Sequence, residues 1–252
     1  MNFNRRFLAL AASSLVIASS AQAWSLTFGS GERVNGSGEI ASETRDVGSF
    51  DAVALSGGFK VLVRQNITAR LELKADKNLL ALIETKVVEG SKGRTLEISP
   101  KRGYNLAATV TPIITLDMAQ LRALSIAGSG GVRVEAMKTP SVDASIAGSG
   151  DIQFTDLDSD RLGVKVAGSG DVTATGRADK LDVSVAGSGD VKLRGLVAQE
   201  VKVSIAGSGD AQVQAVKALK VSVSGSGDVG YIGSPEISMS VAGSGKVRRL
   251  QN

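Results

Sequence analysis

The 252-residue chain contains no cysteine and no histidine. Without cysteine no disulfide can form, so packing and backbone pairing alone must hold the folded chain together. The two absences also exclude zinc sites built on these residues, catalysis by a histidine base, and lipid attachment through an N-terminal cysteine. Several common kinds of metalloprotein and enzyme are therefore excluded before any motif is considered.

A large excess of charge is also missing. The chain has 29 basic and 25 acidic residues, and two of the basic ones, Arg5 and Arg6, belong to a segment that we expect to be removed. This near balance gives no reason to expect a nucleic-acid partner.

No apolar run is long enough to cross a membrane. The apolar stretch at residues 7–18 falls short of the about 20 residues that a spanning helix needs. It follows two arginines and precedes Ala-Gln-Ala at residues 21–23, which is the pattern of a secretory signal peptide. We therefore predict a signal peptide at residues 1–23, no transmembrane segment, and an exported mature protein in the periplasm, at the outer-membrane surface or outside the cell.

Glycine, by contrast, is abundant, and much of it lies in a repeated Gly-Ser-Gly motif, which we call the hinge. The stretches VKVAGSGDVTA, VSVAGSGDVKL, VSIAGSGDAQV and VSVSGSGDVGY are near copies of one another. Successive hinges are 18 to 20 residues apart, a period typical of a solenoid whose loops absorb small differences in length. The first glycines of the hinges are Gly128, Gly148, Gly168, Gly187, Gly207, Gly225 and Gly243.

Apolar and polar residues alternate on both sides of each hinge. Val183, Val185 and Val191 share one parity, whereas Ser184 and Lys192 share the other. A period of two indicates strands with one buried face, and the many valine and isoleucine residues favour strands over helices.

Two such strands, a hinge and a variable third segment account for about 20 residues, which is one coil of a parallel β-helix. We therefore predict an all-β fold, a single-stranded parallel β-helix solenoid over residues 45–252. Residues 45–122 would form less regular N-terminal coils and residues 123–249 the regular coils, about ten in all at about 20 residues each. In this fold the hinge glycines are structural corners, because a side chain there would crowd the bend and glycine supplies any positive φ.

The two ends of the solenoid need separate interpretations. Residues 24–44 are rich in glycine, serine and polar residues, which predicts a flexible leader. The segment DKNLLALIETKVV, residues 76–88, predicts one or two helical turns at its start, which would cover the first open coil. At the other end, we expect Lys246, Arg248 and Arg249 to protect the last edge against pairing with another chain, with Arg249 at an inward position.

An aspartate follows five of the hinges, and these residues should stack in a column. Carboxylates about 5 Å apart repel by roughly 1 kcal/mol even at the dielectric of water, so something must offset the repulsion. Each aspartate would accept N–H groups of its own turn, or the column would bind a hard cation such as Ca²⁺. The turn interpretation is favoured, because the nonapeptide Ca²⁺-binding β-roll repeat has a different spacing. The residues are Asp151, Asp171, Asp190, Asp210 and Asp228.

Nothing in the pattern predicts catalytic residues. Polysaccharide-active β-helix enzymes need a localised acid–base cluster in a groove, whereas the acids here recur evenly with the coil. The only aromatic residues in the repeats, Phe154 and Tyr231, take the inward parity and are predicted to be core. The densest charged patch, residues 156–161, is interpreted as a solvated turn.

The segment RDVGSFDAVALSGGFKVLVRQ, followed by ARLELKADKNLL and then by several Ser-Gly-Ser-Gly-type coils, resembles the head GIN domain. This family is also described as the head of an auto-transporter adhesin, and the resemblance covers about residues 36 to 248. The resemblance implies a right-handed β-helix on exported bacterial envelope proteins and brings no catalytic residues with it.

The combined expectation is a non-catalytic, adhesin-like binding or scaffold domain of the bacterial envelope, without a cofactor. Its partner would be an envelope or surface polymer, another protein or a further copy of the chain. The outward positions are mostly serine, threonine, lysine, aspartate and glutamine, which suits flat, wet contacts rather than a deep pocket. A polysaccharide-active β-helix enzyme and a Ca²⁺-stabilised structural scaffold are the alternatives.

Overall fold

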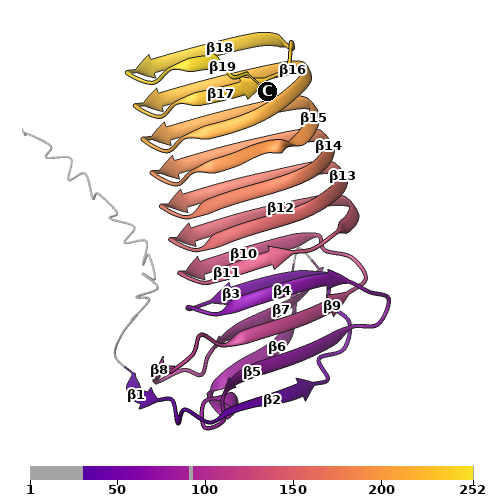
Figure 1. The fold of residues 1–252 in the computed structure, drawn as a ribbon, viewed down its shortest axis with the longest axis vertical. Coiled ribbons are helices and arrows are strands. Elements are labelled where there is room, and N and C mark those ends of the chain that lie inside the picture. Colours follow the sequence, from indigo (N-terminus) through magenta and orange to yellow (C-terminus); the bar gives the residue numbers. More distant parts are fainter. Residues whose placement is uncertain (1–30, 91–92, 252) are drawn as a thin grey trace, which may run out of the picture.

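The computed structural model describes residues 31–90 and 93–251, so the predicted signal peptide lies outside the described residues. The chain forms an all-β solenoid in which coil is stacked on coil along one long axis (Figure 1). Within the described ranges the only helical element is a 3₁₀ turn, η1 (Leu80–Leu82). The same ranges contain no helix of the length and apolar character that a bilayer crossing requires.

The strands fall into an irregular N-terminal part and a regular part. The first comprises β1 (Glu32–Asn35), β2 (Ile40–Arg45), β3 (Ala52–Ser56), β4 (Lys60–Gln65), β5 (Arg70–Asp76), β6 (Ile83–Gly90), β7 (Gly93–Pro100), β8 (Tyr104–Ala107) and β9 (Ile113–Met118). The second comprises β10 (Ala123–Gly128), β11 (Gly131–Val134), β12 (Met137–Gly148), β13 (Asp151–Gly168), β14 (Asp171–Gly187), β15 (Val191–Gly207), β16 (Ala211–Gly225), β17 (Val229–Ile232), β18 (Glu236–Gly243) and β19 (Val247–Arg249). Each of β13 and β14 extends from one hinge to the next and so makes one coil.

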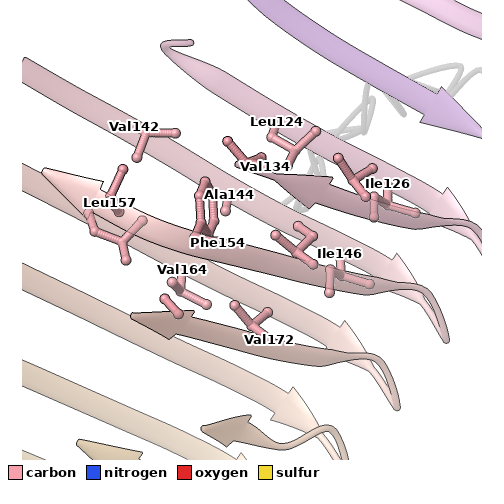
Figure 2. Close-up of a cluster of buried hydrophobic side chains, with 14 of the residues drawn as sticks. Leu124, Ile126, Val134, Val142, Ala144, Ile146, Phe154, Leu157, Val164 and Val172 are labelled. Atoms are coloured by element: carbon pink, nitrogen blue, oxygen red, sulfur yellow. The ribbon is translucent and has the colours of Figure 1, made fainter. Parts of the chain in front are cut away.

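Strands before the hinges stack in one column and strands after the hinges in another. The pre-hinge column contains β7, β3, β10, the later halves of β12 to β16, and β18. The post-hinge column contains β9, β4, β11, the first parts of β13 to β16, β17 and β19. The chain reverses direction at each hinge, so the two columns face each other across the core (Figure 2).

Successive coils pair residue for residue at the spacing that the hinges predict. Gly128, Gly148, Gly168, Gly187, Gly207, Gly225 and Gly243 follow one another in a single parallel register, which makes six steps of 18 to 20 residues. The predicted solenoid and its period are therefore confirmed.

The core is a narrow apolar space between the two columns, filled by the inward parity. Ile126, Val134, Ile146 and Phe154 point into it from successive coils (Figure 2), and Phe154 is only 1% exposed. Burying one such side chain stabilises a fold by about 1.5–3 kcal/mol, so the regular coils gain most of their stability from this repeated contact. The prediction that Phe154 is core is confirmed, and Tyr231 packs against the same core from a partly buried position.

The estimate of about ten coils is wrong, because only one coil precedes the six regular steps. That coil runs from β3 through Ser56-Gly57-Gly58 to β4, and it pairs in parallel with β10 and β11. Between β4 and β10 the chain changes direction: β5 is antiparallel to β2 and β9, and β6 is antiparallel to β7. Alternation of apolar and polar residues is the same in parallel and antiparallel strands, so the pattern could not distinguish them.

The N-terminal end of the solenoid is closed by β2, β6 and η1 (Figure 1). The predicted helical turns are present as the single 3₁₀ turn, and Leu79 beside it is fully buried. Arg45 of β2 fixes the turn, since its guanidinium donates to the carbonyl oxygens of Leu80 at 2.7 Å and Ile83 at 2.6 Å. This end therefore has its apolar interior covered.

The flexible leader predicted at residues 24–44 lies outside the described residues up to residue 30, and the prediction is wrong where β1 and β2 form. β1 pairs in parallel with β8, and β2 pairs antiparallel with β5. Both strands have mostly exposed side chains, which explains the polar composition. These two strands are held in an ordered conformation by backbone pairing, which the amino-acid composition does not reveal.

A buried carboxylate, Asp76, ties the N-terminal strands together. It is completely inaccessible to solvent and accepts hydrogen bonds from the Gly38 N–H (2.8 Å), the Thr109 N–H (2.9 Å) and the Thr109 hydroxyl (2.6 Å). These donors, led by the Thr109 hydroxyl, hold the pKa of Asp76 below its ordinary value because they favour the charged form. The carboxylate joins the β1–β2 connection to the β8–β9 connection.

The C-terminal end differs from the N-terminal end because no strand in the described part of the chain covers it. β18 and β19 pair only with the coil beneath them. Met239 and Val241 continue the inward ladder of Val221 and Val223, yet they are 58% and 40% exposed. Arg249 is exposed and donates to the Ser234 hydroxyl at 2.9 Å.

Candidate functional surface

The hinge corners line one edge of the solenoid, and their geometry explains their composition. Gly187 has a φ of 130°, in the half of conformational space that other residues avoid. A Cβ atom on Gly187 would collide with the carbonyl oxygen of Gly168 in the coil beneath, and one on Gly189 would lie 2.8 Å from Val166 Cγ1. The crowding therefore comes from the neighbouring coil more than from the bend itself.

Each hinge also satisfies the backbone of its neighbour. The N–H groups of Ser188 and Gly189 both donate to the Gly168 carbonyl oxygen, at 2.9 and 3.1 Å. The same arrangement joins the later hinges, so the corner is a continuous hydrogen-bonded ribbon. These contacts join each hinge to the hinge of the coil beneath through its backbone groups.

The aspartates form a column, but their bonds differ from the expected ones. The Asp171 carboxylate accepts the backbone N–H of Asp190 at 3.0 Å, and Asp190 accepts that of Asp210 at 3.2 Å. The series continues from Asp210 to Asp228 and from Asp228 to Lys246. Four of the five carboxylates, those of Asp171, Asp190, Asp210 and Asp228, thus bond the next coil rather than their own turn, which corrects the turn interpretation for them.

Two arrangements reduce the repulsion between these carboxylates. The amide donors place positive partial charge against one oxygen of each, and Lys192 Nζ lies 3.4 Å from Asp190 and 3.9 Å from Asp171. In the described residues no three acidic side chains come together in a group that could hold a metal ion. Neighbouring coils therefore supply the column with hydrogen-bond donors and a positive charge from the protein itself.

Replacing Asp190 by asparagine should leave stability within about 0.5 kcal/mol of the parent, because the amide oxygen still accepts the Asp210 N–H. Replacing it by alanine should cost about 0.5–1.5 kcal/mol, because that N–H loses its partner. Urea unfolding of both variants measures the difference. Equal losses in the two variants would contradict this role of the side-chain oxygen. A melting temperature that rises with Ca²⁺ in the parent but not in an Asp190→Asn, Asp210→Asn protein would show that the column binds a cation.

The charged patch at residues 156–161 lies within strand β13, so its interpretation as a solvated turn is wrong. Arg177 binds Asp158 through two hydrogen bonds, at 2.8 and 2.7 Å. Arg161 bridges two coils, with 3.1 Å to Asp143 and 3.0 Å to Asp182. The partners of these charged residues lie on adjacent coils, so residues close to them in the sequence do not reveal the ion pairs.

These ion pairs move pKa values away from the range that acid–base catalysis uses. The hydrogen bond from Arg177 lowers the pKa of Asp158, and the hydrogen bond to Asp182 raises the pKa of Arg161. A general acid or base works best with a pKa near the pH of the reaction. The patch therefore links neighbouring coils.

The outward side of the pre-hinge column presents a flat area of short side chains, which we call the small-residue face. One ladder on it is mostly serine and the adjacent ladder is mostly alanine, because five of the seven hinges follow the sequence Ser-Val-Ala or Ser-Ile-Ala. A shallow groove of about 420 Å³ runs along its first coils. The ladders are Ser125, Ser145, Lys165, Ser184, Ser204, Ser222 and Ser240, and Ala127, Ala147, Ala167, Ala186, Ala206, Ser224 and Ala242.

This face can make repeated shallow contacts. Its only charged side chain is Lys165, and the serines have no acid or base partner among the residues that line the groove. The ladders repeat with the coil, about 4.8 Å apart, so an extended partner would meet the same groups several times. The geometry suits adhesion to an extended molecule.

A family model described as "Putative auto-transporter adhesin, head GIN domain" matches residues 49–235. None of the curated proteins matches the chain. The match covers the first hinge-like coil and all but the last of the regular coils.

Several solved structures share the fold. A protein of Bacteroides fragilis, described as a putative adhesin, has 25% identity and a TM-score of 0.79, and the match covers 86% of this chain and all of that one. A protein of Parabacteroides distasonis, described as a putative lipid binding protein, has 27% identity and a TM-score of 0.70, with 87% and 100% covered. A putative adhesin of Parabacteroides merdae has 21% identity and a TM-score of 0.70 over the same shares, which is a likeness of fold.

Proposed function

Because the chain belongs to the head GIN domain family, we propose that it is a non-catalytic, adhesin-like binding or scaffold domain that is exported to the bacterial envelope. The similarity to the Bacteroides fragilis protein, described as a putative adhesin, supports this proposal. The signal-peptide pattern at residues 1–23 supports export.

The observation that carries the proposal is the small-residue face. Adhesion to a polymer needs many weak, similar contacts rather than one deep pocket, and their effects multiply when the contacts are linked. The two ladders offer such contacts on seven successive coils, with serine hydroxyl groups that both donate and accept hydrogen bonds. The partner is an extended envelope or surface polymer, or a protein with an extended segment.

The proposal is tested by retention of the mature protein on envelope fractions, on an array of bacterial glycans and on lipid vesicles. We expect an envelope polymer to retain the protein and an Ala186→Arg variant to bind at least about 10-fold more weakly, because the arginine stands above the flat face. Gln153→Arg is the matched control, since Gln153 is equally an exposed residue of a regular coil but lies on the post-hinge column.

Three results would contradict the proposal. Absence of retention on every fraction, glycan and vesicle would remove the binding function. Equal weakening by Ala186→Arg and Gln153→Arg would show that the small-residue face is not the contact surface. Release of altered glycan into solution would show an enzyme instead.

A further inference from the structure

The last coil leaves a section through the core uncovered. Met239 and Val241 occupy inward positions whose equivalents in the coil beneath, Val221 and Val223, are buried. An uncovered hydrophobic section with unpaired strand edges favours association, because both the apolar groups and the backbone donors lack partners. No strand among residues 31–90 and 93–251 lies over this section.

Protection of this edge by charge is confined to one of its two strands. Lys246, Arg248 and Arg249 lie in or just before β19, as the sequence predicts. β18 carries a single charged residue, Glu236, at its first position, and continues as Ile-Ser-Met-Ser-Val-Ala-Gly. Its outer edge is therefore open to pairing along most of its length.

We propose that two copies of this chain associate through their C-terminal ends, with the last coil of one stacked on the last coil of the other. The opposite end of the solenoid cannot take this place, because η1 and the side chain of Arg45 close it. The uncovered apolar section of one copy contacts that of the other only when the two C-terminal ends face each other. Such a contact is a closed two-fold dimer and does not continue into a filament.

The charges of the last coil select one arrangement of the dimer. The pre-hinge and post-hinge strands run in opposite directions (Figure 2). A two-fold axis parallel to the strands therefore places β18 of each copy antiparallel over β19 of the other, whereas an axis perpendicular to the sheets would place β19 on β19. The second arrangement brings Arg248 against its own copy, and like charges directly opposite are destabilising. The first brings the basic strand over the strand that carries Glu236.

The contact area is sufficient for a specific but weak dimer. β18 has 8 residues, which at about 3.3 Å per residue is a length of about 26 Å. Two sheets about 10 Å apart with their outer side chains give a width of about 20 Å, so the section measures about 500 Å² per copy. The total of about 1,000 Å² reaches the lower limit of biological interfaces, and the paired edges add backbone hydrogen bonds.

The test is sedimentation velocity of the mature protein from about 1 μM to about 1 mM, a range in which an interface of this size dissociates. We expect a reversible monomer–dimer equilibrium and no larger species. The double substitution Met239→Lys, Val241→Lys should raise the dissociation constant by about 100-fold, because it places unpaired charges in the contact. Both side chains are exposed in the monomer, so circular dichroism and the urea midpoint should not change.

Val110→Lys is the matched control, because Val110 is a similarly exposed valine, at 55%, near the closed end. This variant should dimerise like the parent protein. A monomer at every concentration, a dimer that persists in the double lysine variant, or oligomers larger than the dimer would each overturn the proposal. No envelope ligand is present in this experiment, so its outcome is independent of the proposed adhesive function.

The orientation is tested by pairs of spin labels, since the chain has no cysteine and single cysteines can be introduced cleanly. Labels at Ser238→Cys should lie within about 30 Å of each other, and labels at Ile67→Cys about 70 Å apart or more, given about 4.8 Å per coil. Close labels at Ile67 would show contact through the other end and overturn the proposal.

Discussion

Gly187→Ala should destabilise the protein by about 3–5 kcal/mol, a large part of the stability of a typical domain. Two costs combine: a φ of 130° is strained for alanine, and the new methyl group would collide with the carbonyl oxygen of Gly168. Relief would require the coils to separate, which breaks the bonds from Ser188 and Gly189 to that oxygen. Urea unfolding followed by circular dichroism measures the loss.

The matched control for this substitution is Gly131→Ala. Gly131 lies directly after the first hinge, yet a Cβ atom there meets no atom within 4 Å and its φ is not positive. The variant should be as stable as the parent or up to about 1 kcal/mol more stable, because alanine restricts the unfolded chain. Similar losses in both variants would contradict a stacking role for the hinge glycines.

Asp76→Ala should loosen the β1–β2 connection from the β8–β9 connection at the N-terminal end. It removes the acceptor shared by the N–H groups of Gly38 and Thr109 and the Thr109 hydroxyl, and so breaks the link between the two connections that these residues belong to. Amide exchange in β1, β2 and β8 should become at least about 100-fold faster, while β13 to β16 should keep their protection. An unchanged exchange pattern would show that Asp76 is not the anchor.

The same carboxylate gives the protein a dependence on acid. The pKa of Asp76 is lower in the folded chain than in the unfolded chain, so its contribution is complete above the ordinary aspartate pKa. It is lost as the pH falls through the lower, folded value. Asp158, whose pKa Arg177 lowers, acts in the same direction. The N-terminal strands should therefore exchange faster in acid in the parent, and Asp76→Ala should show a smaller change.

The regular coils were predictable because their sequence repeats what the structure repeats. Alternation on both sides of Gly187 identified the inward residues, and the hinge spacing identified the residues that pair, so parity and period together specify each coil. The surface that we propose for binding was also visible in part, since serine and alanine recur at fixed positions before each hinge.

The N-terminal strands and the partners of the charged residues were not predictable in this way. The alternation of apolar and polar residues in β5 and β6 does not indicate whether these strands pair in parallel or antiparallel. The polar side chains of β2 give no sign that its backbone is ordered by pairing. Asp76 has no local signature, because its three donors come from residues more than 30 positions away. The bonds of Asp190 and Arg161 likewise depend on neighbours one coil distant.

The six similar register steps, each of 18 to 20 residues, have a consequence for how such a protein evolves. Every regular coil has nearly the same coil above and below it, so the junction left after loss or duplication of one whole repeat resembles the junctions already present. Unequal recombination within the repeated coding sequence would therefore yield shorter or longer descendants that fold at once. The length of the solenoid can thus change in single genetic events, without new side-chain contacts having to be selected.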